Sequence, residues 1–304
     1  MSDMAQKDTA FKVLLAIGVA HLLNDAVQSV IPAIYPIIKD EFALTFTQIG
    51  LITLVFQMTS SIFQPFVGRY ADNHPSPYAL TAGMCISLCG IFLLAFAGNF
   101  GMMLVAVSVV GIGSSIFHPE ASRVAQMAAG KRKGLAQSIF QVGGNGGSAI
   151  GPLLAALIIL PNGINSAMWF AIALIVGAFV VARVGRWYKR VVASSMVSDV
   201  RKAVSVLDLT PCQVRNAMIV LVVLTFSKQF YMSSMTSYFT FFLMDKFEMT
   251  VRDSQLCLFA FLTASAIGII AGGWIGDKIG RKYVIWCSIL GAAPFALMLP
   301  YVGL

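Results

Sequence analysis

Long apolar runs separated by short polar stretches recur along the whole chain. A helix needs roughly 20 residues to cross the hydrocarbon core of a bilayer. Nine runs are near or above that length, at residues 11–37, 46–68, 78–97, 101–127, 134–160, 165–187, 216–244, 254–275 and 283–303. The pattern predicts nine membrane-spanning helices and an all-α membrane protein.

The longest polar stretch between runs divides the spans into two groups. Six spans precede it and three follow it, and it ends in the turn signal Thr210-Pro211. We therefore predict a six-helix bundle over 1–188, a cytoplasmic linker over 189–215, and an incomplete second bundle of about three helices over 216–304.

Composition and charge support a membrane protein and argue against nucleic-acid binding. Hydrophobic residues make up 58% of the chain and charged residues 11%, whereas soluble domains carry about 25% charged residues. The net charge of +8 comes from short loops between the apolar runs. If the N-terminus is cytoplasmic, every Lys and Arg lies on the cytoplasmic side except Lys39, Lys246, Arg252 and Lys228. This asymmetry is typical of a multi-pass protein with a cytoplasmic N-terminus.

The sequence offers little that suggests an enzyme. It contains no nucleotide-binding loop, no catalytic-triad spacing and no cluster with metal-ligand spacing, so we expect no cofactor and no metal. We expect the five cysteines to be small buried apolar residues without disulfides.

An internal repeat relates the two groups of spans at an offset of 205 residues. The segment 40–45 follows the first span and resembles 245–250 after the seventh, while Gly68 and Asp72 match Gly273 and Asp277. Six helices per repeat preserve orientation, so the halves are parallel, as in one class of transporters.

The loop between the eighth and ninth spans carries the most specific motif. Residues Gly273–Lys282 read GWIGDKIGRK, which resembles the loop signature of the major facilitator superfamily. The resemblance implies the major facilitator fold and a role in cytoplasmic gating for Gly68, Asp72, Gly273, Asp277, Gly280, Arg281 and Lys282. The alternative is that the basic residues only fix the topology.

A glycine-rich segment in the fifth span carries a second resemblance. Gly147, Gly151 and Pro152 are similar to the antiporter motif of drug–proton exporters, which favours export. The alternative is close packing of helices through small residues.

Further segments, 21–25, 113–120, 134–145 and 280–286, resemble drug-efflux permeases of bacterial inner membranes. That resemblance implies a monomeric, multi-pass transporter that exports a small drug and is driven by protons.

Ionisable residues inside spans are costly in lipid and point to function. His21, Asn24, Asp25 and Gln28 share one face of the first span, which makes them candidates for lining a cavity. Burial penalises the charged form of a carboxylate, so Asp25 is a candidate carrier of the coupling proton. A purely structural polar network is the alternative.

The fourth span supplies His118 and Glu120 as other candidate proton sites. Glu120 can pair with Arg123 three residues later, either at the cavity or as a structural ion pair.

Lys228 lies mid-way along the seventh span, on a face with Tyr231 and Tyr238. Because the first and seventh spans are repeat partners, we expect these residues to line the central cavity. Lys228 would face Asp25 or bind an anionic substrate such as a phosphonate.

Two other interpretations remain open. A proton-coupled importer of a small metabolite would have the same fold and charges. The chain also ends in its ninth span, where the superfamily has twelve, so a truncated or non-transporting fragment is the third possibility.

Overall fold

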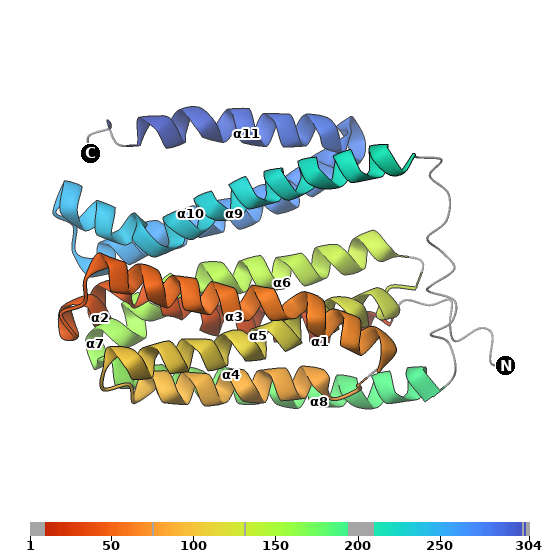
Figure 1. The fold of residues 1–304 in the computed structure, drawn as a ribbon, viewed down its shortest axis with the longest axis horizontal. Helices are drawn as coiled ribbons and strands as arrows, with labels where there is room; N and C mark the ends of the chain where they lie inside the picture. The colour runs from red at the N-terminus through yellow and green to blue at the C-terminus, as the bar shows by residue number, and fades with distance from the viewer. Residues whose placement is uncertain (1–9, 75, 131, 194–209, 300, 302–304) are drawn as a thin grey trace.

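Every regular element in the described part of the chain is a helix (Figure 1). The computed structural model describes residues 10–74, 76–130, 132–193, 210–299 and 301. The helices are α1 Phe11–Ala33, α2 Tyr35–Glu41, α3 Phe46–Asn73, α4 Ala79–Ala95, α5 Phe100–Ala128, α6 Lys133–Leu154, α7 Leu160–Asn162, α8 Phe170–Ala193, α9 Pro211–Phe247, α10 Val251–Ile279 and α11 Arg281–Met298, with a π-helical turn at Ala155–Ile159 and a 3₁₀ turn at Ile164–Trp169.

Each of the nine predicted spans corresponds to a helix, so the all-α membrane class is confirmed. Seven helices are long and apolar enough to cross a bilayer, and two shorter apolar helices, Ala79–Ala95 and Lys282–Met298, complete the set. The first span is shorter than predicted because the helix breaks at Ile34. Pro36 has no N–H to donate to the carbonyl of Pro32, so the helical ladder is interrupted there.

The sequence repeat is also visible in the backbone. Two non-glycine residues, Ala43 and Glu248, adopt left-handed conformations with φ of 48° and 53°, and they stand 205 positions apart. Two residues further on, the hydroxyls of Thr45 and Thr250 accept the backbone N–H of Gln48 and Asp253, at 3.2 and 3.1 Å. Each threonine thus caps the helix that follows it. The repeat therefore preserves the backbone conformation of the turn as well as its sequence.

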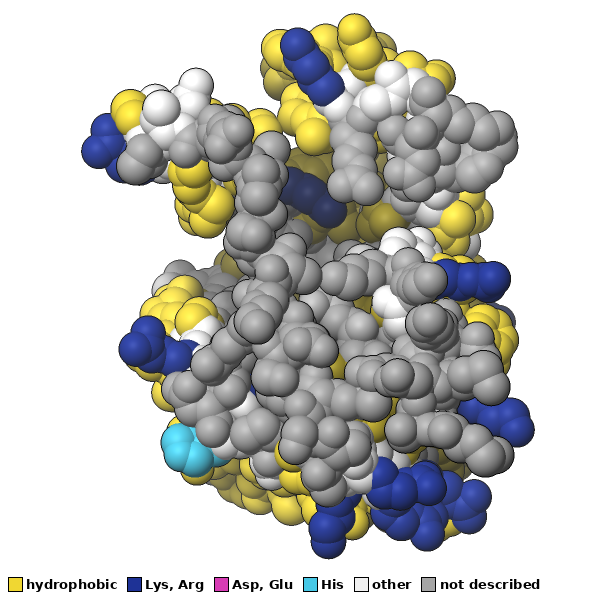
Figure 2. All heavy atoms as spheres, turned by 90° about the vertical axis from the view of Figure 1, so that its right-hand side faces the viewer, with side chains coloured by type: hydrophobic (Ala, Val, Ile, Leu, Met, Phe, Trp, Pro, Cys, Tyr) yellow, Lys and Arg dark blue, Asp and Glu magenta, His cyan; other side chains and the backbone are white. Residues whose placement is uncertain are grey.

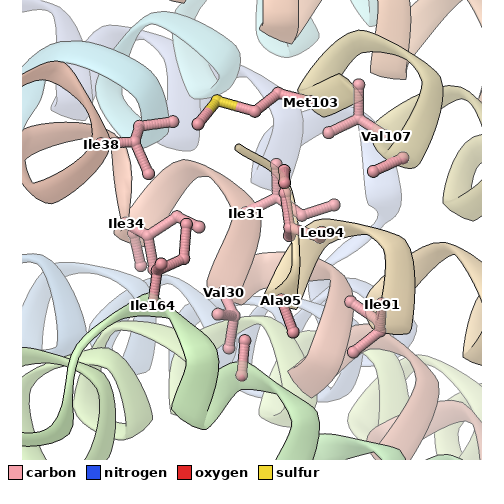
Figure 3. Close-up of a cluster of buried hydrophobic side chains, with 14 of the residues drawn as sticks. Val30, Ile31, Ile34, Ile38, Ile91, Leu94, Ala95, Met103, Val107 and Ile164 are labelled. Atoms are coloured by element: carbon pink, nitrogen blue, oxygen red, sulfur yellow. The ribbon is translucent and has the colours of Figure 1, made fainter. Parts of the chain in front are cut away.

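Two clusters of buried apolar side chains occupy opposite ends of the first eight helices. One gathers residues from the end of α1, the end of α4 and the beginning of α5, including Ile31, Leu94 and Val107 (Figure 3). The other joins the beginning of α1 to the end of α5 and to α6 and α8, with Ile17 and Phe117 among its members. The positions between the clusters are the polar ones, and they carry the site described below.

Helices α9 to α11 meet the first eight helices over a limited area. Gln255 of α10 donates from its side-chain amide to the carbonyl of Ala33 at the end of α1. Ser237 of α9 lies 3.3 Å from Thr53 of α3, and the rings of Phe46 and Phe241 meet edge to face. These contacts involve the beginnings of α3 and α10 and the last turns of α9.

At the opposite end the two groups of helices are separated. The first turns of α9 are exposed along their whole circumference, with Phe226 and Phe230 each 70% exposed. Figure 2 looks onto this end and shows a hollow between the upper and lower helices, with Lys and Arg side chains around it. The molecule is therefore open at the end that carries its basic loops.

Many apolar side chains outside the hollow are also exposed, as expected for surfaces that contact lipid. The cysteines correct our prediction of burial: Cys257 is half-buried and the other four are exposed. The small apolar side chain is equally compatible with a lipid-facing position. The division into a bundle, a linker and a partial bundle stays a prediction, and most of the expected linker lies outside the described residues.

Candidate functional site

The polar centre of the first eight helices is a cluster of one carboxylate and two imidazoles, which we call the Asp25 cluster (His21, Asp25 and His118). Nε2 of His21 lies 3.2 Å from one carboxylate oxygen of Asp25, one helical turn away on α1. Nε2 of His118, on α5, lies 3.3 Å from the other oxygen. The cluster joins two helices that are far apart in the sequence.

Each member of the cluster has a second anchor. Nδ1 of His21 lies 2.8 Å from the carbonyl oxygen of Phe140 on α6, and the two rings stack with centroids 4.0 Å apart. Nδ1 of His118 lies 2.9 Å from the carbonyl of Ser114. Asn24 donates its amide to Asp25 at 3.2 Å. The carboxylate is held from three directions, with 16% of its side chain exposed.

The glycines of α6 allow this arrangement because they let α1 and α6 approach closely. A methyl group on Gly144 would collide with the His21 ring, and one on Gly147 would collide with the backbone of α1 at Leu22. Gly151 lies against Ser29 in the same way. The predicted packing through small residues is therefore present.

Pro152 follows this strip and precedes the π-helical turn at Ala155–Ile159. Such turns are rare and are frequent at functional sites. The antiporter role of Gly147, Gly151 and Pro152 stays a prediction.

A cavity of about 170 Å³ lies beside the cluster, where the two groups of helices meet. Asp25 and Gln28 line it from α1, and Thr236 and Ser237 from α9. The rest of the lining comes from α1, α2, α3, α6 and α10 and is formed by Ser29, Pro32, Tyr35, Thr53, Phe56, Gln57, Ser148, Pro152, Leu258 and Leu262. The lining combines hydroxyls and amides with apolar side chains, and Asp25 is its single carboxylate.

The structure brings together most of the polar residues predicted from the first span. His21, Asn24 and Gln28 are buried, and Asp25 and Gln28 reach the cavity. His118, which the sequence offered only as an alternative proton site, joins them from α5 through its contact with Asp25. Glu120, the third, is 1% exposed and lies 3.9 Å from Arg123, so it belongs to a different group of contacts.

Arg123 has a partner that the sequence did not indicate. Its guanidinium donates to the carbonyls of Gly68 and Ala71 near the end of α3. The Ala71 carbonyl is among the last four of α3, which have no partner within the helix, and a cation there also matches the negative end of the helix dipole. The role predicted for Arg123 in substrate binding stays a prediction, as does that of Glu120 in proton transfer.

On α9, the residues that line the cavity are Thr236 and Ser237, next to the predicted Tyr238. Tyr238 is half-buried and its hydroxyl lies against Gly50 of α3, while Lys228 and Tyr231 are exposed. The structure pairs Asp25 with the two histidines rather than with Lys228. Sequence analysis missed Thr53, Thr236 and Ser237, although hydroxyl residues within an apolar span were an available signal.

The predicted gating loops are described only in part. Asp72, Gly273, Asp277 and Arg281 are described only as helical positions, and their surroundings lie outside the described part of the structure. Gly68 receives Arg123, Lys282 is exposed, and Gly280 has a φ of 108° where α10 gives way to α11. Such a φ favours glycine, which explains that one position of the motif; the gating roles stay predictions.

The Asp25 cluster has one property that the sequence did not suggest. Its three side chains each offer a ligand atom, and these atoms lie within 4.8 Å of one another, a spacing that a metal ion could also use. Direct hydrogen bonds account for the two short contacts without an ion. The expectation of no metal site stays a prediction.

Comparison with known sequences decides the family. The sequence profile of the Major Facilitator Superfamily matches residues 17–304. The chain belongs to the Major Facilitator Superfamily. The fold class predicted from the loop motif is therefore confirmed, and the chain is a multi-pass member of a transporter family.

Two curated relatives match along nearly the whole chain. The fosmidomycin resistance protein of Escherichia coli (strain K12) is 54% identical over 296 residues, covering 97% of this chain and 72% of that protein. The uncharacterized MFS-type transporter YfnC of Bacillus subtilis (strain 168) is 42% identical over the same length and coverage. These identities confirm that the chain is related to a bacterial drug-resistance protein.

Solved structures support the fold. A bacterial homologue of the human lysosomal transporter Spinster, in an inward-facing and unoccupied conformation, superposes with a TM-score of 0.66 at 18% identity. The match covers 91% of this chain and 64% of that one, so this chain spans less than two thirds of that relative's length.

Proposed function

We propose that this chain exports a small antimicrobial across the bacterial inner membrane, with a phosphonate such as fosmidomycin as substrate and inward proton flow as the driving force. The observation that carries the proposal is the Asp25 cluster, a carboxylate held by two imidazoles at the border of a cavity between the two groups of helices. Identity of 54% to a fosmidomycin resistance protein supports the choice of substrate.

The geometry supports alternating access. Asp25 lines the cavity and also contacts the two imidazoles. Protonation of the cluster and binding of substrate in the cavity therefore act on the same carboxylate. The molecule is open at the end that carries the basic loops (Figure 2). If those loops are cytoplasmic, as the positive-inside rule predicts, a drug would enter from the cytoplasm. A monomer suffices, since cluster and cavity are built from one chain.

Lys228 supplies a cation for an anionic drug. Met232, one turn further along α9, and Phe239 pack against the small cluster of Ala149, Leu258 and Leu262 between α6 and α10. Lys228 shares that inward face and is exposed, which supports a position on the hollow, between solvent and cavity.

The proton role is tested by Asp25→Asn in a strain that lacks other exporters of the drug. We expect resistance to fall to that of the empty vector, because the amide cannot exchange the coupling proton. Asp40→Asn, in the exposed end of α2, is the matched control and should retain resistance. Full resistance in Asp25→Asn at equal membrane expression would exclude this carboxylate as the coupling group.

The role of Lys228 is tested separately by Lys228→Met, with Lys246→Met as the control on the same helix. Lys246 lies over the rings of Phe242 and Phe247 near the other end of α9. We expect a loss of resistance only in the first variant. Unchanged resistance at equal expression would discard the cation as a substrate contact.

Direction is tested in inside-out vesicles with an imposed proton gradient. An exporter accumulates labelled drug inside such vesicles when their lumen is acidic, and drug addition releases protons from the lumen. Accumulation only with the opposite gradient would support the proton-coupled importer instead.

A further inference from the structure

The hydrogen-bond partners of the two histidines fix which ring nitrogen carries hydrogen. A backbone carbonyl oxygen can only accept. Nδ1 of His21 faces the carbonyl of Phe140 at 2.8 Å, and Nδ1 of His118 faces that of Ser114 at 2.9 Å. Both Nδ1 atoms therefore donate, and the Ser114 hydroxyl, 3.1 Å from His118, can accept the same hydrogen. In a neutral imidazole, Nε2 then carries a lone pair.

Both Nε2 atoms point at the carboxylate of Asp25, each at a different oxygen and at 3.2 and 3.3 Å. An ionised carboxylate also only accepts. Each contact is a hydrogen bond only if a proton lies between nitrogen and oxygen. With no such proton the three side chains carry a total charge of −1, with one a charge of 0, and with two a charge of +1. Only the last state satisfies both contacts.

We infer that the Asp25 cluster takes up and releases two protons in each transport cycle, one at each imidazole–carboxylate contact. His21 then serves both as a proton site and as the residue that positions the carboxylate. The inference rests on the proposed proton coupling and adds its stoichiometry.

The surroundings of the cluster allow both the loaded and the empty state. His21 is held by its stack on Phe140 and by the lack of space at Gly144, so it stays aimed at the carboxylate. Asn24 still donates to Asp25 when both protons have left. The deprotonated carboxylate therefore keeps a partner instead of being stranded in an apolar interior.

Few other charges of the described residues can take part in this titration. The residues of α6 that contact the cluster, Phe140, Gly144 and Gly147, carry no charge. The basic residues of α8, Arg183, Arg186, Lys189 and Arg190, are exposed. On α5, Glu120 lies 3.9 Å from Arg123, and Arg123 also donates to carbonyls near the end of α3. Lys228 is not among the residues that line the cavity, and Tyr35 is the other titratable group of the cavity wall.

The number of protons sets how steeply drug accumulation follows the pH gradient. With the membrane potential clamped to zero, each coupled proton supports about a tenfold concentration ratio per pH unit, so two protons support about a hundredfold ratio. The test uses the full chain in proteoliposomes with potassium and valinomycin, labelled fosmidomycin as probe, and correction for ionisation of the drug. EDTA in all buffers excludes a metal ion from the cluster.

We expect the wild-type ratio at steady state to rise about a hundredfold per pH unit, and that of His21→Asn to rise about tenfold. The asparagine amide can still donate to the Phe140 carbonyl but offers no second nitrogen. His118→Asn should also give tenfold, which covers the case in which His21→Asn does not fold. A tenfold wild-type ratio would overturn two-proton coupling and leave proton coupling standing. A hundredfold ratio in His21→Asn would overturn the role of His21, and no gradient-driven accumulation would overturn the proposed function with it.

Discussion

Gly147 sits at a close approach of α6 to α1, and Gly146 beside it does not. Comparing alanine substitutions at the two positions therefore measures how much stability depends on this approach. A Cβ at position 147 would overlap the carbonyl oxygen of Leu22 and lie 2.8 Å from the backbone nitrogen of Ala26 and 3.1 Å from Cβ of Asp25. Backbone atoms cannot move aside alone, so the two helices must separate. At position 146 the nearest atom is a methyl carbon of Leu22, 3.8 Å away, an ordinary contact.

The expected magnitude follows from two opposing terms. Replacing glycine by alanine inside a helix stabilises it by up to about 1 kcal/mol, and both variants gain this. Overpacking costs about 1–3 kcal/mol, and only Gly147→Ala incurs it. Gly147→Ala should therefore be less stable than Gly146→Ala by about 1–3 kcal/mol, the overpacking cost alone.

Thermal unfolding of the purified variants in one detergent, followed by tryptophan fluorescence, measures the difference. We expect a melting temperature several degrees lower for Gly147→Ala and one at or slightly above wild type for Gly146→Ala. Equal melting temperatures would refute the close approach of α1 and α6 at this position. The same variant should also lose proton-driven transport, because the displaced segment of α1 carries Asp25.

Two further predictions concern contacts between distant helices. Gln255→Leu removes the hydrogen bond to the Ala33 carbonyl. Such bonds contribute about 0.6–1.7 kcal/mol in membrane proteins, so the substitution should favour separation of α1 and α10 by about 3- to 18-fold. At the opposite, open end of the molecule, spin labels on the last turns of α3 and the first turns of α9 should then come closer together. Unchanged label distances would contradict a latch between α1 and α10. Arg123→Met leaves the carbonyls of Gly68 and Ala71 without their charged donor. The loss should destabilise the end of α3 by about 1.5–3 kcal/mol and speed amide hydrogen exchange in its last turns. Exchange protection equal to wild type would show that the arginine is not needed to cap α3.

The sequence by itself determined the class of protein, the nine spans and the parallel repeat. Those features are local, because a run of apolar residues long enough to cross a bilayer forms a helix there wherever it packs. The repeated turn also depends on local sequence, since Thr45 and Thr250 cap helices through contacts with residues three positions away. The polar face of the first span was also predictable, since helical periodicity alone brings His21, Asp25 and Gln28 together.

Only the tertiary structure decided what those residues meet. Asp25 bonds to His118, 93 positions along the chain, and Arg123 reaches back across 52 residues to α3, pairings that no local pattern specifies. Thr53 and Ser237 became cavity residues because α3 and α9 cross there. The glycines of α6 explain why such partners are fixed so closely. Because Gly143, Gly144 and Gly147 let α6 approach α1, the Phe140 carbonyl reaches His21, and that contact sets which nitrogen faces the carboxylate.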